Sequence, residues 1–199
     1  MIFITVLEDK LRNIPLRDHI TRVLRVIVVN IVLTAVYFFA VSGEFYLRGT
    51  GPALMQSLLV LVKLGLFIYI LLFLRRFLVD WYDFHRADTL LVFLILLNVL
   101  ITYFTLRGMF SAAFVMRMFP VIIAVNIVWG LSICILGLRF LQIPEPQKLC
   151  RNVLGVSLIL AGLLFASQYL ALYSFIPALL ADIALLRLLW LIRLKVINS

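Results

Sequence analysis

Charged residues are scarce in this sequence. Only 14% of its 199 residues are Asp, Glu, Lys or Arg, whereas 65% are hydrophobic and the mean hydropathy is +1.19. A soluble domain contains about a quarter charged residues, and at this length it still exposes about a third of its surface. The apolar excess therefore excludes a soluble enzyme, a nucleic-acid-binding domain and a disordered regulator, because lipid must be the solvent for most of the chain.

Residues that carry metal and redox chemistry are equally few. The two cysteines, Cys134 and Cys150, form no C-x-x-C motif and predict no disulfide framework. The two histidines, His19 and His85, lie outside the apolar runs, which argues against a haem held by two histidines inside the membrane. No H-E-x-x-H, G-x-S-x-G or Walker motif is present. The sequence thus predicts no catalytic residue, no cofactor and no metal site.

The sequence has six long apolar runs instead. A helix needs about 20 residues to cross the hydrocarbon core, and the runs are too long and too continuous for the alternating strands of a membrane barrel. We therefore predict an all-α, polytopic transmembrane helix bundle that forms a single domain, 1–199. Its six spans are expected at about 23–41, 57–74, 89–106, 119–138, 153–173 and 175–192. The joint between the last two, around Ser174 and Pro177, fits either a tight hairpin or one kinked segment.

The distribution of lysine and arginine predicts the orientation. Thirteen of these residues fall in the N-terminal segment, the second and fourth connections and the C-terminal tail, whereas three fall on the other side. The positive-inside rule then predicts a protein of the plasma or inner membrane with both termini on the cytoplasmic side. In residues 1–22, apolar Met1–Leu7 precede the charges, which is unlike a signal peptide. This pattern predicts a short amphipathic segment at the cytoplasmic interface.

Three charged residues lie at depth in the predicted spans: Lys63, Asp182 and Arg187. A charge at that depth is costly and normally has a partner, water or a ligand beside it. Lys63 either extends its ammonium to the interface or pairs with a carboxylate, and Asp182 lies at a similar depth. A contact between Lys63 and Asp182, joining spans two and six, is the sharpest structural prediction. Asp182 and Arg187 are five residues apart, so they pair poorly with each other.

Four amides are predicted at depth, one in each of spans one, three, four and five: Asn30, Asn98, Asn126 and Gln168. Such amides usually form hydrogen bonds between helices; alternatively, they line one polar path together with the charged residues. Small residues four apart favour close helix contact, within or between chains. They are Ser157 and Ala161, Gly162 and Ala166, and Gly130 and Cys134.

The connection between spans two and three is the densest polar stretch. Its candidate residues are Arg75, Arg76, Asp80, Asp83, His85 and Asp88. Carboxylates spaced D-x-x-D, as Asp80 and Asp83 are, can bind Mg²⁺ and a diphosphate. The CDP-alcohol phosphotransferases use such a site, but their motif continues with Gly where this chain has Phe84, and no second acidic pair follows. The favoured interpretation is a helix extension with an Arg76–Asp80 pair and Asp88 as a helix cap.

Three classes of function remain. The favoured one is a membrane subunit, sensor or adaptor without a catalytic centre, which acts through helix packing and a cytoplasmic protein partner or a second copy of the chain. The alternative is a transporter or channel for an ion or small solute, with a polar path near Lys63, Asp182 and Arg187. The third is a lipid-modifying enzyme that uses Asp80 and Asp83. The expected partners are the lipid bilayer and a protein, not a nucleic acid.

Overall fold

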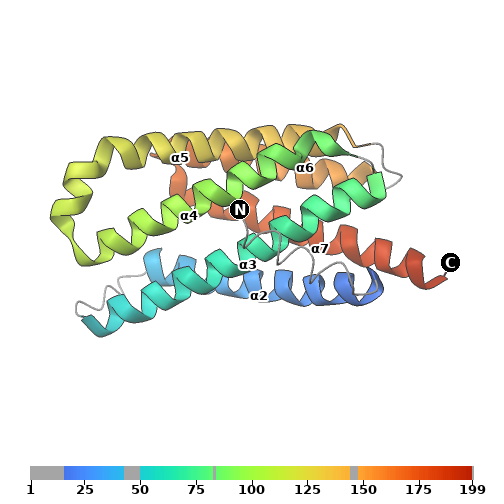
Figure 1. Cartoon of the computed structure of the whole chain (residues 1–199), viewed down its shortest axis with the longest axis horizontal. Helices are drawn as coiled ribbons and strands as arrows, with labels where there is room; N and C mark the ends of the chain where they lie inside the picture. Colours follow the sequence, from blue (N-terminus) through green and yellow to red (C-terminus); the bar gives the residue numbers. More distant parts are fainter. Residues whose placement is uncertain (1–15, 43–49, 83, 144–147, 199) are drawn as a thin grey trace.

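The described part of the chain folds into six long helices, which lie side by side (Figure 1). The computed structural model describes residues 16–42, 50–82, 84–143 and 148–198, and no strand occurs in those ranges. The six helices are α2 (Leu16–Ser42), α3 (Thr50–Tyr82), α4 (Asp88–Phe110), α5 (Ala112–Leu141), α6 (Lys148–Ala166) and α7 (Phe175–Asn198). Two short 3₁₀ helices, η1 (His85–Ala87) and η2 (Ala171–Ser174), precede α4 and α7. All six long helices are long and apolar enough to cross a membrane, which confirms the prediction of an all-helical chain with six candidate spans.

The helices form a closed ring. Each one packs against the helices before and after it in sequence, and α2 also packs against α7. Short connections enforce this order, since they leave consecutive helices no choice but to run antiparallel side by side. The connection between α4 and α5 is a single residue, Ser111, whose hydroxyl accepts a hydrogen bond from the backbone N–H of Phe114 at 3.3 Å. Ser111 therefore caps α5 at the point where the chain reverses.

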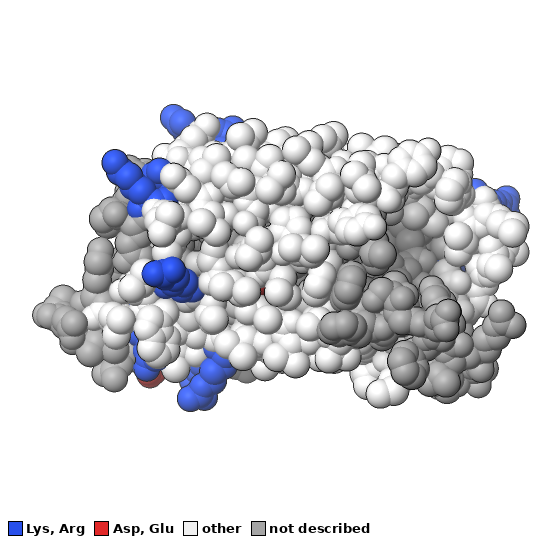
Figure 2. Space-filling view, turned by 180° about the vertical axis from the view of Figure 1, so that it is seen from behind, with Lys and Arg blue, Asp and Glu red and all other residues white. Residues whose placement is uncertain are grey.

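The apolar core lies toward one end of this ring. The largest fully buried side chains sit near the start of α2 and α4 and near the end of α3 and α7; they are Ile20, Val23, Ile27, Leu78, Leu91, Leu94 and Leu189. Lysine and arginine side chains gather around the same end, and few appear at the other (Figure 2). We call this the basic end: it carries the start of α2, the end of α7 and the α3–α4 and α5–α6 connections.

Most helices extend beyond the predicted spans, and two boundaries change the predicted organisation of the chain. Helix α2 begins at Leu16, so residues 16–22 continue the first span, with His19 and Ile20 buried, rather than forming a separate segment. Residues 1–15 lie outside the described residues. Helix α6 ends at Ala166 and not near Tyr173, because Gln168 adopts a left-handed backbone conformation (φ 60°) that ends the helix. A turn and η2 then lead into α7, so the joint is a tight hairpin.

Helices α5 and α6 approach each other closely along a glycine seam. A Cβ added to Gly162 would lie 2.3 Å from the carbonyl oxygen of Gly130, and one added to Gly137 would lie 2.6 Å from that of Gly155. Each helix thus presents two glycines seven residues apart, which is two helical turns, and the antiparallel register brings them face to face. The predicted small-residue contact therefore exists, and it lies within the chain.

Candidate functional site

A polar cluster joins three helices inside the ring. The side-chain amide of Asn30 on α2 donates a hydrogen bond to the Asp182 carboxylate on α7, with Nδ2 and Oδ2 2.9 Å apart. Asn30 is only 9% exposed, and the ammonium of Lys63 on α3 is near enough to interact electrostatically with Asp182. Asn30 lies about 18 Å along α2 from Asp18, and Asp182 lies about 18 Å along α7 from Leu194. The opposite ends of these two spans, Val36 and Phe175, are about 9 and 10 Å away, so the cluster lies inside the apolar helices, about a third of the way from the end opposite the basic end.

The prediction of a Lys63–Asp182 contact named two of the three helices of this cluster, α3 and α7, but not α2, which contributes Asn30. Among the described residues, the Asn30 amide hydrogen-bonds to Asp182, and Lys63 interacts with the same carboxylate electrostatically. An amide can satisfy a carboxylate oxygen without bringing a second full charge out of water, whose desolvation cost often exceeds the gain from pairing. The bond also joins the first and last helices of the ring.

The other polar residues predicted at depth do not join this cluster. Arg187 is exposed on the outer surface of α7. Asn98 and Asn126 are only partly buried, and within the described residues neither makes a hydrogen bond. Gln168 lies in the turn after α6, where its side-chain amide donates to the Phe165 carbonyl at 3.2 Å. Within the described residues, therefore, no hydrogen bond links these four side chains to the Asn30–Asp182 pair.

Arginines hold the carboxylates of the α3–α4 connection. Arg76 donates to Asp80 one helical turn away at 3.1 Å, which confirms the predicted pair. Asp88 is not the cap of α4: Ala87 occupies that position, and Asp88 is the first helical residue. Its carboxylate instead receives two hydrogen bonds from Arg75, from Nε and from Nη2, because an arginine fork matches both carboxylate oxygens.

The remaining candidates of this connection contribute less to the structure. His85 lies exposed in η1, and Asp83 lies outside the described residues, so the structure does not place the two carboxylates of the D-x-x-D pattern relative to each other. The Arg75–Asp88 bridge fixes the end of α3 against the start of α4. The connection is therefore a tied corner at the basic end of the ring.

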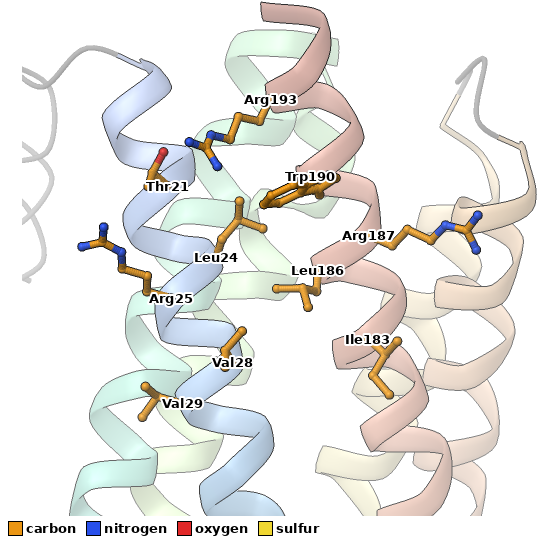
Figure 3. Close-up of a pocket in the computed structure, with 10 residues that line it drawn as sticks. All are labelled: Thr21, Leu24, Arg25, Val28, Val29, Ile183, Leu186, Arg187, Trp190 and Arg193. Atoms are coloured by element: carbon orange, nitrogen blue, oxygen red, sulfur yellow. The ribbon is translucent and has the colours of Figure 1, made fainter. Parts of the chain in front are cut away.

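A groove between α2 and α7 was not anticipated from the sequence. It encloses about 720 Å³ and is lined by Thr21, Leu24, Arg25, Val28, Val29, Ile183, Leu186, Arg187, Trp190 and Arg193 (Figure 3). In sequence, Arg25 and Arg193 indicated only the orientation of the chain, and Arg187 was a candidate for the polar path. The arginines can be recognised as one group only once it is known that α2 packs against α7, and the sequence alone does not show that contact.

Comparisons of the chain with protein-family models, with curated proteins and with solved structures find no match.

Proposed function

We propose that this chain is a membrane subunit or adaptor without a catalytic centre, whose fixed helix ring presents its basic end to a cytoplasmic protein partner. The observation that carries the proposal is the Asn30–Asp182 hydrogen bond. It uses the deepest carboxylate of the chain to fasten α2 to α7. A carboxylate that accepts a hydrogen bond between two helices stabilises the bundle and is not free to bind a substrate.

The tied corner at the α3–α4 connection supports the same proposal. The Arg75–Asp88 bridge orients η1, and it leaves His85 and Arg86 exposed at the basic end. Exposed polar side chains on a fixed corner are suited to contact another protein, because little conformational freedom is lost when the partner binds. The partner is expected to present acidic side chains, since the basic end carries an excess of positive charge.

Site-specific photo-crosslinking in native membranes tests this proposal. A photoreactive amino acid replaces Arg86 at the basic end or, as a matched control, Arg117 at the opposite end, since both arginines are exposed. We expect a single stoichiometric protein adduct from position 86 and none from position 117. Adducts of equal yield from both positions, or no discrete adduct from position 86, would contradict a docking role for the corner.

We propose that the basic end faces the cytoplasm, on the strength of the positive charge gathered there. The same two positions test this. In a variant without Cys134 and Cys150, a single cysteine at position 86 is expected to react with a membrane-impermeant maleimide only after the membrane is permeabilised. A cysteine at position 117 is expected to react in intact cells. The reverse pattern would invert the proposed topology.

A second candidate, an ion or solute transporter, rests on the ammonium and carboxylate of Lys63 and Asp182 inside the apolar helices. It predicts flux in liposomes that contain this chain alone, and loss of that flux in Asp182→Asn. The Arg117→Gln variant is the control, because Arg117 is exposed near the start of α5, outside the cluster. Flux without a partner protein would favour this candidate over the adaptor.

A further inference from the structure

The groove between α2 and α7 opens on the outer surface of the ring. Val28, Val29 and Trp190, which line it, are each about half exposed, whereas Leu24 at its floor is buried. The two helices are in direct contact, so the groove is a furrow over their seam and not an entrance to the interior. In a bilayer, lipid is the surrounding medium of such a surface.

The groove combines a cationic part with an apolar part. Arg25 and Arg187 each lie five residues toward the basic end from the hydrogen-bonded pair of Asn30 and Asp182. The antiparallel register therefore places the two arginines at the same depth on opposite walls, about 7.5 Å from that bond. They flank the opening, pointing to either side of it (Figure 3).

Arg193 stands at the end of the groove nearest the basic end. Its side chain points from α7 toward α2 (Figure 3), and its guanidinium carbon lies 5.4 Å from the centre of the Trp190 ring. Its Nε atom is buried and, among the described residues, has no hydrogen-bond partner. A buried donor of a charged group without an acceptor is costly, and an anion bound at the rest of the same guanidinium would offset that cost.

Among the described residues, the lining contains three arginines and no carboxylate. Deeper in the membrane, its walls are aliphatic, formed by Val28, Val29, Ile183 and Leu186. A ligand that fits must therefore carry a negative group near the interface and an apolar chain that continues toward the bilayer centre. Guanidinium groups bind phosphate oxygens through paired hydrogen bonds, and basic pockets between transmembrane helices bind anionic head groups.

We propose that this groove binds an anionic phospholipid, with the head-group phosphate beside Arg193 and an acyl chain along the aliphatic walls; Arg25 and Arg187, whose side chains point outward on either side of the groove, add positive charge at the same interface (Figure 3). A zwitterionic lipid also has a phosphate, but its ammonium would meet three arginines and no carboxylate. The lipid belongs to the leaflet at the basic end. It covers the seam between α2 and α7 at the place where the ring closes.

Quenching of Trp190 fluorescence tests the proposal. The full chain, with Trp81 and Trp129 replaced by phenylalanine, is reconstituted in phosphatidylcholine vesicles that contain increasing fractions of phosphatidylglycerol. One lipid at a time carries bromine on its acyl chains, and bromine quenches a tryptophan it touches. We expect phosphatidylglycerol to quench Trp190 at least fivefold more effectively than its mole fraction predicts, since one arginine near an anionic surface is worth about fivefold.

Three variants separate the groove from the general charge of the basic end. The Arg187→Gln and Arg193→Gln variants are each expected to lower the preference for phosphatidylglycerol about fivefold. Arg86→Gln removes a charge of the same end outside the groove, and it is expected to leave the preference nearly unchanged. Native mass spectrometry of lipid retained in detergent gives a second measurement that does not depend on the tryptophan substitutions.

Three results would overturn the proposal. Equal quenching by the two lipids would show that the groove does not select charge. An effect of Arg86→Gln as large as that of Arg187→Gln would assign the preference to the basic end as a whole. Protection of Trp190 from both lipids would show that another protein helix occupies the groove.

Discussion

The close contact of α5 and α6 at the glycine seam predicts that a single added methyl group lowers the free energy of unfolding. The perturbation is Gly162→Ala in α6, where the new Cβ would lie 2.3 Å from the Gly130 carbonyl oxygen and 2.7 Å from the sulfur of Cys134. Carbon and oxygen atoms in contact normally stay at least about 3.3 Å apart. The two helices must therefore separate locally by about 1 Å, and backbone on both sides must move.

The magnitude follows from the packing energy that this separation removes. A gap of about 1 Å forfeits up to about half of the dispersion energy of the atom pairs it separates, and overpacking a tight site typically costs about 1–3 kcal/mol. Replacing glycine by alanine within a helix also stabilises it by up to about 1 kcal/mol. A control must remove that contribution, and Gly65→Ala in α3 does so because a Cβ there meets no atom within 4 Å.

The assay is equilibrium unfolding of the purified chain in mixed micelles, with increasing sodium dodecyl sulfate and helicity followed by circular dichroism. We expect the free energy of unfolding of Gly162→Ala to be about 1–3 kcal/mol below that of Gly65→Ala. The double variant with Gly130→Ala is expected to lose less than the sum of the single losses, because a seam already opened relieves the second clash. Equal stability of Gly162→Ala and Gly65→Ala would refute the close approach of α5 and α6.

Three further predictions concern named contacts. A double-mutant cycle with Asn30→Leu and Asp182→Leu is expected to give a coupling energy of about 1–2 kcal/mol in the same unfolding assay; strictly additive losses would mean that the two side chains do not meet. A cycle with Arg75→Gln and Asp88→Asn should give a larger coupling energy than a cycle on the exposed Arg76–Asp80 pair, for which roughly 0.3–0.5 kcal/mol is typical. Equal coupling energies for Arg75–Asp88 and Arg76–Asp80 would contradict the two-bond geometry. Replacing Gln168 by Val is expected to destabilise the chain, because a β-branched residue is strained at φ 60°, whereas Gly there should be tolerated; the reverse order would place the turn elsewhere.

Much of the architecture was predictable because it follows from properties that can be read along the sequence, such as the length of each apolar run. The lengths of the apolar runs gave six helices, since a membrane span has a minimum length. The end of α6 was predicted too far along the chain because residues 167–173 are apolar enough to continue a span. The left-handed backbone of Gln168 depends on turn geometry that hydropathy does not register.

The candidate site was only partly predictable, because its contacts join helices distant in sequence. Asn30 and Asp182 are separated by 152 residues, and depth alone allowed either Asn30 or Lys63 to be the direct partner of the carboxylate. The choice depends on how far each helix is rotated about its axis. The facing glycines of α5 and α6, by contrast, could have been found, because their equal spacing of seven residues on consecutive helices is visible in the sequence.

The closure of the ring by α2 and α7 sets the order in which the chain can mature. Asp182, the hydrogen-bond partner of Asn30, follows it by 152 residues and therefore enters the membrane later by the time needed to synthesise that length. At about 5–20 residues per second, that interval lasts about 8–30 s. During it, the face of α2 that will meet α7 is open to lipid, to water or to the insertion machinery. The ring is therefore completed late in synthesis, when α7 enters the membrane and packs against α2.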